Sequence, residues 1–295
     1  MPELPDLTVY VEALRTRVVR TRLEGVRLGN PFLLRTVDPP LDLAFGRSVD
    51  SVGLLGKRIV FSLEGDLHLV VHLMIAGRLH WKPAGAKIEG RRGLAAFDFE
   101  RGTLTLTEAG SKRRAALHVV AGAVGLGTLN RGGLDVMCAS AEAFGAALVA
   151  ENHTLKRALT DPRLFSGIGN SYSDEILHAA RLSPMQLTRN LADEEIARLH
   201  AVVVTTVREW TERLRAAAGD GFPEKVTAFR DEMAVHGRFG KPCPVCRSPV
   251  QRIVYAENEA NYCATCQTGG RLLADRALSR LLRDDWPRRL EEVAD

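Results

Sequence analysis

Four of the five cysteines in the chain form two closely spaced pairs, a pattern typical of metal binding. The pairs are Cys243-Pro-Val-Cys246 and Cys263-Ala-Thr-Cys266, with sixteen residues between them. Each pair can direct two thiolates to one point, and together they supply the four sulfur ligands that suit tetrahedral Zn²⁺. Because four protein ligands leave no open position, we expect one structural zinc ion and a β-hairpin between the pairs. Two disulfides or a redox-active pair are the alternatives, and Cys138 is expected to be a small, buried apolar residue.

A glycine-containing turn before an expected helix is a candidate binding site for a phosphate group. The segment is Phe165-Ser166-Gly167-Ile168-Gly169-Asn170, and the helical pattern Tyr172–Ala180 follows it. Gly167 and Gly169 let the backbone approach a partner closely, and the first amides of a helix favour an anion. The segment lacks the lysine of a nucleotide-binding P-loop and follows no strand, which argues against a nucleoside triphosphate. An ordinary tight turn is the alternative.

The first residues of the chain offer a nucleophile. If Met1 is removed, Pro2 presents a secondary amine. Free α-amino groups titrate near pH ~8, so a useful fraction is neutral at physiological pH. A neutral amine can attack an electrophilic carbon and form an iminium ion, and Glu3 is placed to move protons for it. The alternative is that Met-Pro is only a translation start.

A β-rich region followed by a helical region must position these groups. A helix is expected to begin near Pro5, because apolar residues recur on one face at Leu7, Val11, Leu14 and Val18. Two hairpins and one further strand are expected after it, with strands over Ile59–Leu63 and Leu67–Met74, over Ala95–Phe99 and Thr103–Thr107, and over Ala115–Val120.

Helical patterns dominate the second half of the chain. Gly122–Gly133 is interpreted as a glycine-rich connector, and helical patterns begin at about residue 140. Asn152–Thr160 is predicted to be helical, and a long helix is predicted from Asp193 to a stop at Gly219. After the cysteines, Arg271–Arg283 is predicted to be an amphipathic helix that docks on the body of the protein.

Composition and charge narrow the classes of function. The chain has 295 residues, 45% of them hydrophobic and 26% charged, which is typical of a globular protein of two or three domains. No apolar run is long enough to cross a bilayer, and the acidic start does not match a signal peptide. Residues 1–135 carry 19 basic and 14 acidic residues, so the first half suits a polyanion. We therefore expect a cytoplasmic protein with no membrane partner and without disulfides.

Taken together, three of these features resemble the formamidopyrimidine-DNA glycosylase/endonuclease VIII family of base-excision repair enzymes. They are the start Pro2-Glu3-Leu4-Pro5, the segment Gly167–Glu175 and the four-cysteine hairpin that ends Cys-Ala-Thr-Cys-Gln. The resemblance covers residues 2 to about 267 and implies an α+β protein of two lobes. It implies an N-terminal β-sandwich catalytic domain with a leading helix (1–135), a helix-two-turns-helix DNA-binding domain (136–236) and a zinc finger (237–267), with a helical tail over 268–295.

The resemblance also implies roles for particular residues. Pro2 would attack C1′ of a flipped-out nucleotide and expel the damaged base, with Glu3 as the acid/base partner. The resulting Schiff base would permit β- and δ-elimination, which nick the strand. Lys57 matches the lysine that serves the family's site, Asn170 matches its phosphate-holding asparagine, and Glu175 matches its helix glutamate. The expected partner is damaged DNA, bound by a monomer in the bacterial cytoplasm and nucleoid.

Several residues depart from the family pattern. Asp6 stands where glutamate is usual, and Asn258 replaces the hairpin arginine between Glu257 and Glu259, which lowers the positive charge at the tip. His72-Leu73-Met74-Ile75-Ala76-Gly77 resembles the family's His-Leu-Gly-Met-Ser-Gly, with the methionine displaced by one position. Lys112-Arg113-Arg114 keeps the arginine that reads the opposite strand but lacks the neighbouring phenylalanine. These departures leave open which damaged base is recognised.

Three functions therefore compete. The first is a bifunctional DNA glycosylase and AP lyase, which intact Pro2, Glu3 and Lys57 favour. The second is a catalytically weak or inactive protein of the same fold that binds damaged DNA, which Asn258 favours. The third is an enzyme that processes RNA.

Overall fold

The computed structural model describes residues 1–110, 112–224, 226–227, 230–255, 258–274 and 288–293. The chain forms two compact units. One comprises Met1–Arg131 with Glu209–Thr227, and the other comprises Gly132–Arg208 with Ala228–Asp295. In the described part of the chain, no helix is both long enough and apolar enough to span a bilayer.

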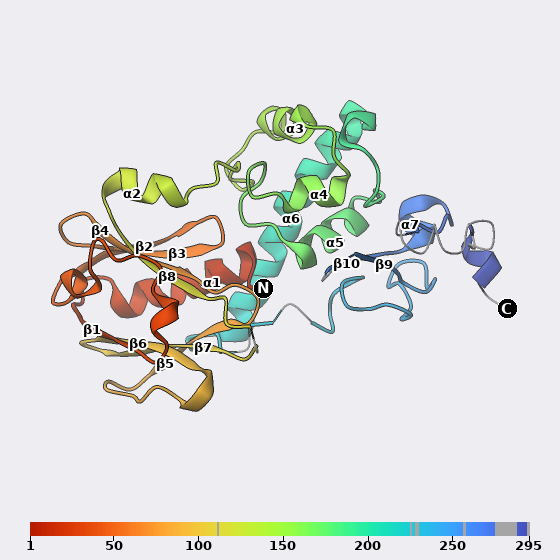
Figure 1. Ribbon diagram of the computed structural model, residues 1–295. Coiled ribbons are helices and arrows are strands. Elements are labelled where there is room, and N and C mark those ends of the chain that lie inside the picture. The colour runs from red at the N-terminus through yellow and green to blue at the C-terminus, as the bar shows by residue number, and fades with distance from the viewer. Residues whose placement is uncertain (111, 225, 228–229, 256–257, 275–287, 294–295) are drawn as a thin grey trace. The chain divides into compact units, whose positions relative to one another are not determined.

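The first unit is built around two four-stranded antiparallel sheets (Figure 1). Helix α1 (Leu4–Val18) leads. One sheet has the order β1-β6-β7-β5 and the other has the order β2-β3-β4-β8. Their strands are β1 (Leu23–Leu28), β2 (Val49–Leu55), β3 (Arg58–Leu63), β4 (Leu67–His72), β5 (Gly77–Lys82), β6 (Gly93–Phe99), β7 (Gly102–Glu108) and β8 (Ala116–Ala121).

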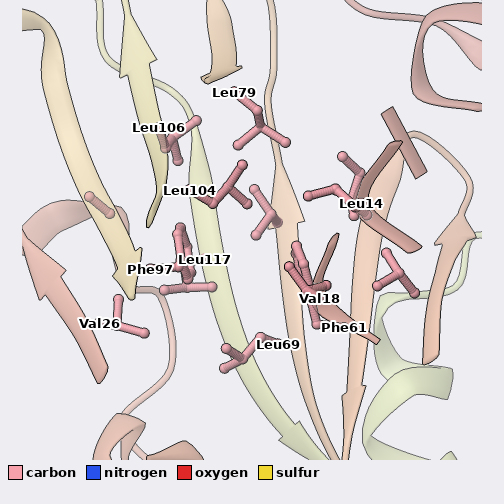
Figure 2. Close-up of a cluster of buried hydrophobic side chains, with 14 of the residues drawn as sticks. Leu14, Val18, Val26, Phe61, Leu69, Leu79, Phe97, Leu104, Leu106 and Leu117 are labelled. Carbon is pink, nitrogen blue, oxygen red and sulfur yellow. The ribbon is translucent and has the colours of Figure 1, made fainter. Parts of the chain in front are cut away.

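The core of this unit lies between the two sheets and α1 (Figure 2). Phe61 of β3 stacks on Phe97 of β6 with ring centroids 6.4 Å apart, so side chains of both sheets meet in one layer. The helix contributes the face predicted from the sequence, because Leu7, Val11, Leu14 and Val18 are all buried. The predicted β-sandwich with a leading helix is confirmed, and both predicted hairpins form, as β3 with β4 and β6 with β7.

The opposite face of the β2-β3-β4-β8 sheet is covered by helix α2 (Gly122–Leu129). Val60, Val70 and Val120 are buried there, with Leu126 and Leu129 of the helix packed against them. The prediction of a connector over Gly122–Gly133 was therefore wrong for its first eight residues. Glycine lowers helix propensity, but here small residues let the helix lie close to the sheet. A Cβ on Gly125 would come within 3.0 Å of the Val120 Cβ.

The second unit is mainly helical and ends in a small β-ribbon. The sequence prediction placed helix α5 and the start of α6 to within two residues, and Gly219 follows the end of α6 in a left-handed conformation. The predicted hairpin between the cysteine pairs is the antiparallel ribbon of β9 and β10. The elements are α3 (Ala141–Ala150), α4 (Leu155–Thr160), α5 (Asn170–Ala179), α6 (Asp193–Ala218), β9 (Gln251–Tyr255), β10 (Asn258–Tyr262) and α7 (Ala264–Thr268). The part of α6 from Glu209 onward belongs to the first unit.

Short 3-10 turns occupy Pro31–Leu33, Leu41–Ala44, Gly90–Arg92, Thr188–Asn190 and Leu290–Val293. Most of the helix predicted over Arg271–Arg283 lies outside the described residues.

Candidate functional site: a buried N-terminus, a helix-capping turn and a four-cysteine centre

The N-terminal residues are packed into the first unit rather than extended from it. Pro2 is buried and Glu3 is only 2% exposed. Glu3 lies just before α1, and its backbone N–H donates a hydrogen bond of 3.0 Å to the Asp6 carboxylate. A glutamate at this third helical position would also cap the helix. The shorter Asp6 therefore still fixes the start of α1, and with it the placement of the first residues.

The surroundings of the terminal nitrogen favour a neutral amine. Burial lowers the pKa of the amine, which belongs to Met1 in this chain, below its ordinary value of 8.0. The Glu3 carboxylate opposes this effect, whereas the nearby cations Arg78 and Lys57 lower the pKa further. Arg78 was not predicted as a site residue. No motif marks it, and only its position at the start of β5 brings it to the N-terminus.

Lys57 occupies the tight turn between β2 and β3, where Gly56 adopts a left-handed conformation with φ +61°. The next residue, Arg58, pairs across the sheet with His72 at the end of β4. Burial lowers the pKa of His72 to about 4, and the cations Arg58 and Lys57 contribute to the shift. His72 is therefore a neutral imidazole at physiological pH, beside groups that are positively charged.

Met74 and Ile75, from the motif His72–Gly77 that resembles the family's, lie in the turn between β4 and β5. Met74 has the left-handed φ of +53°, a conformation that glycine adopts without strain, while Ile75 is 57% exposed. The turn is tight, because a Cβ on Gly77 would lie 2.2 Å from the Leu73 carbonyl oxygen. Ile75, and not Met74, is the more exposed apolar side chain at this tip.

Lys112, Arg113 and Arg114 lie together on the loop that joins β7 to β8, and all three are exposed. The loop is anchored by Glu108, which is 2% exposed and accepts hydrogen bonds from the backbone N–H groups of Arg114 and Ala115, at 3.1 Å. No sequence motif indicates this role of Glu108. It holds the three cations on the surface of the first unit.

In the second unit, Gly167 and Gly169 lie in the turn before α5, and Asn170 is the first residue of that helix. Gly167 requires its residue type, since its φ is +83°. Lys156, which was not predicted as a site residue, stabilises this turn through two hydrogen bonds. Its ammonium group donates to the Asn170 carbonyl at 2.6 Å and to the Asp174 carboxylate at 2.5 Å. This arrangement holds the N-terminus of α5 in a fixed position.

Glu175 is buried and has a structural role in this geometry. Its carboxylate accepts three backbone hydrogen bonds of 2.7 to 2.9 Å, from Ala234, Val235 and His236. The ring of His236 in turn contacts the Asp174 carboxylate at 2.8 Å. Helix α5 is thereby tied to the segment that leads into the cysteine pairs.

The four paired cysteines converge on one point, with all four sulfur atoms within 4.8 Å of one another. None of them forms a disulfide, and a cluster of four sulfurs is the donor set and the geometry that Zn²⁺ prefers. Burial raises the pKa of Cys266 to about 11, whereas hydrogen bonds with Ser248 lower the pKa of Cys246 to about 6, and a bound Zn²⁺ would hold all four sulfurs as thiolates. The residues therefore fit one structural zinc ion. His178 contacts the Cys243 sulfur at 3.3 Å.

The predictions for Cys138 and Asn258 have different outcomes. Cys138 is exposed, so the prediction that it would be a buried apolar residue was wrong. Asn258 begins β10 and pairs with Tyr255 through the backbone, but its side chain and Glu257 lie outside what the structure describes.

Three comparisons bear on these features. Family models match residues 1–115 as the formamidopyrimidine-DNA glycosylase N-terminal domain, 136–217 as its H2TH domain, and 240–269 as a zinc finger found in FPG and IleRS. The formamidopyrimidine-DNA glycosylase of Thermus thermophilus is 33% identical over 283 residues, which cover 92% of this chain and all of that protein.

A formamidopyrimidine-DNA glycosylase-like protein of Mycobacterium tuberculosis is 36% identical over 151 residues, which cover 51% of this chain and 94% of that protein. Among solved structures, Lactococcus lactis Fpg in complex with DNA containing an abasic site has a TM-score of 0.80. It is 20% identical, and the match covers 90% of this chain and 99% of that one, which shows a common fold.

Proposed function

Because the chain belongs to the formamidopyrimidine-DNA glycosylase family, we propose that it excises damaged bases from DNA and cleaves the resulting abasic site, with Pro2 as the nucleophile. The proposal rests above all on the environment of the terminal nitrogen. That nitrogen is buried beside Glu3 and near Lys57 and Arg78. Removal of Met1 would place the secondary amine of Pro2 in these surroundings, where burial and two cations favour its neutral, nucleophilic form.

The chemistry follows from that nitrogen. The lone pair of Pro2 forms a bond to C1′ of the damaged nucleotide, and the bond from C1′ to the base breaks as the base leaves with a proton. Opening of the sugar ring gives an iminium ion that withdraws electrons from C2′. Loss of a C2′ proton then expels the 3′ phosphate, and a second elimination expels the 5′ phosphate. Glu3 is the group in place to move these protons, because it adjoins Pro2 and is itself held at the start of α1.

The remaining site residues would hold the DNA. Lys57 and His72 suit the phosphates around the reacting sugar, one as a cation and the other as a neutral donor. The turn Gly167–Asn170, backed by Lys156, suits a further phosphate. Lys112, Arg113 and Arg114 would read or hold the opposite strand, and Ile75 is the side chain best exposed to fill the space left by a flipped nucleotide.

We assign one role to each predicted domain. Residues 1–135 would carry out catalysis, 136–236 would bind phosphate, and 237–267 would form a zinc-stabilised hairpin that presents Asn258 to the DNA. Cys243, Cys246, Cys263 and Cys266 would hold the zinc ion, which supplies rigidity and no chemistry to the reaction. We expect the protein to act as a monomer, and light scattering of the free protein and of its DNA complex tests this.

The test uses duplexes that carry single lesions or an abasic site. Pro2→Gly and Glu3→Gln should each reduce base release and strand nicking by at least 100-fold, while DNA affinity changes by only a few-fold. Glu24→Gln, which removes an exposed carboxylate in the same unit, is the matched control and should match wild type. Nicking of abasic DNA by Pro2→Gly at the wild-type rate would refute the assignment.

The same experiment separates the alternatives. A wild-type protein that binds damaged duplexes but neither nicks them nor forms a covalent adduct with them is a binding protein of this fold. Preferential competition by duplex RNA would instead indicate an enzyme that acts on RNA.

A further inference from the structure

One end of the β2-β3-β4-β8 sheet carries a cluster of basic side chains that the catalytic proposal does not fully use. Arg58 pairs with His72 across β3 and β4, and His118 of β8 pairs with Val70, two residues before His72. These positions alternate with the core-facing ones, so the three side chains lie on the face that α2 covers. Arg131 follows α2 directly. We call Arg58, His72, His118 and Arg131 the basic corner.

The two arginines of the corner carry positive charge that acts on their neighbours, whereas the two histidines, whose pKa values are lowered, are neutral at physiological pH. Arg131 lowers the pKa of Arg58, and Arg58 lowers the pKa of both His72 and His118, in each case in addition to a larger effect of burial. In the part of the chain that the structure describes, no carboxylate forms an ion pair with any of the four. Two arginines beside neutral imidazole rings, without an acidic partner, form a site suited to an anion.

The corner is also incompletely hydrogen-bonded. The Arg58 Nε and the His118 Nδ1 are buried and have no hydrogen-bond partner. Arg58 is nevertheless held in place, since its Nη1 donates to the Leu129 carbonyl at the end of α2, at 3.1 Å. Buried polar groups without partners are rare in folded proteins and call for an explanation such as a missing ligand. An anion with several acceptor oxygens supplies what these donors lack.

The corner adjoins the proposed reaction site. Lys57 contributes to the lowered pKa of the terminal amine and also to that of His72. Lys57 is therefore near both the N-terminus and His72 of the corner. A strand held at Lys57 would bring its neighbouring phosphates, which repeat along the backbone, toward the corner.

We propose that the basic corner binds a second backbone phosphate of the damaged strand, next to the phosphate held by Lys57, with Arg58, His118 and Arg131 as its ligands. This inference rests on the proposed function, because the reacting strand must already lie at Pro2. It assigns α2 a role in DNA binding, since Leu129 at the end of the helix anchors Arg58 and Arg131 follows two residues later. Arg58, His118 and Arg131 are then positioning residues for the strand.

The test measures how DNA binding depends on salt. A duplex with a stable abasic-site analogue is titrated with wild type, Arg58→Gln, His118→Gln and Arg131→Gln between about 50 and 200 mM KCl. Loss of Arg58 or Arg131 should weaken binding several-fold at low salt and reduce the slope of log Kd against log salt by about 1. Loss of His118, which is uncharged at neutral pH, should weaken binding several-fold at every salt concentration and leave the slope unchanged. Arg101→Gln, an exposed arginine in the turn between β6 and β7, is the control of equal charge and should keep the wild-type slope.

A second arm locates the phosphate. Each phosphate near the lesion is replaced in turn by an uncharged methylphosphonate. One replacement should weaken DNA binding by wild type but have no further effect on binding by Arg131→Gln. Arg131 is exposed, so this substitution is not expected to perturb the fold.

A wild-type slope in Arg131→Gln together with wild-type affinity in His118→Gln would overturn the inference. The inference would also be overturned if millimolar inorganic phosphate binds at the corner while no methylphosphonate replacement weakens DNA binding by wild type. The corner would then bind a free anion and not a phosphate of the strand. Failure of the proposed function is seen separately, as wild-type protein that forms no covalent adduct with abasic DNA.

Discussion

The protonation of His72 offers a quantitative test of the electrostatics at the proposed site. The pKa of this ring falls from 6.5 to about 4 because the ring is buried and lies near Arg58 and Lys57. The folded chain therefore binds fewer protons than the unfolded chain below pH 6.5. The contribution of neutral His72 to the free energy of unfolding is therefore fully present above pH 6.5 and is lost as the pH falls toward 4. At pH 5 the loss attributable to His72 should be about 2 kcal/mol relative to pH 7.5.

Urea unfolding of wild type and His72→Gln between pH 7.5 and pH 5 measures this effect. The uncharged glutamine cannot take up the proton, so the variant should lose about 2 kcal/mol less free energy of unfolding over this range. Acid also weakens binding of zinc by thiolates, but that contribution is common to both chains and cancels in the difference. Arg58→Gln serves as a control that keeps most of the effect, because burial is its largest cause.

Direct titration of the His72 ring by NMR should give a midpoint near pH 4. Parallel loss of stability in wild type and His72→Gln, or a ring that titrates near 6.5, would refute this description of the site. It would also remove the argument that His72 binds phosphate as a neutral donor beside charged neighbours.

Four further perturbations follow from the structure. Glu175→Gln keeps one carbonyl oxygen where a carboxylate accepted three N–H groups, so the free energy of unfolding should fall by roughly 2–3 kcal/mol; an unchanged urea midpoint contradicts this. Gly77→Ala places a Cβ against the Leu73 carbonyl and should cost roughly 2 kcal/mol, whereas equal thermal stability would show that the turn can relax. A chelator that removes the metal should abolish tight DNA binding, and one equivalent of Zn²⁺ should restore it. Leu290→Ala, which opens the cluster around Tyr262, should release zinc to that chelator several-fold faster than wild type, and equal release rates would exclude a supporting role for the tail.

Much of the framework could be predicted from local patterns. The apolar face that contains Leu7 and Leu14, the hairpins of alternating residues and the spacing of the four cysteines each encode one element or one site. Such signals lie within a few turns of a helix or one hairpin, so a single sequence is enough to find them.

What the sequence did not reveal depends on tertiary contacts. Helix α2 forms despite its glycines because Leu126 and Leu129 find an apolar sheet face to cover. Arg78 and Lys156 reach their sites only through the fold, since neither belongs to a motif. Cys138 carries no local signal that distinguishes an exposed from a buried position.

The central claim is that the nitrogen of Pro2 becomes covalently bonded to the sugar of damaged DNA. The direct measurement is intact mass of the purified protein, followed by borohydride reduction in the presence of abasic-site DNA and peptide mapping of the adduct. We predict a chain that begins at Pro2 and a reduced adduct on its N-terminal nitrogen. A chain that retains Met1, or an adduct mapped to a lysine such as Lys57, would contradict the account.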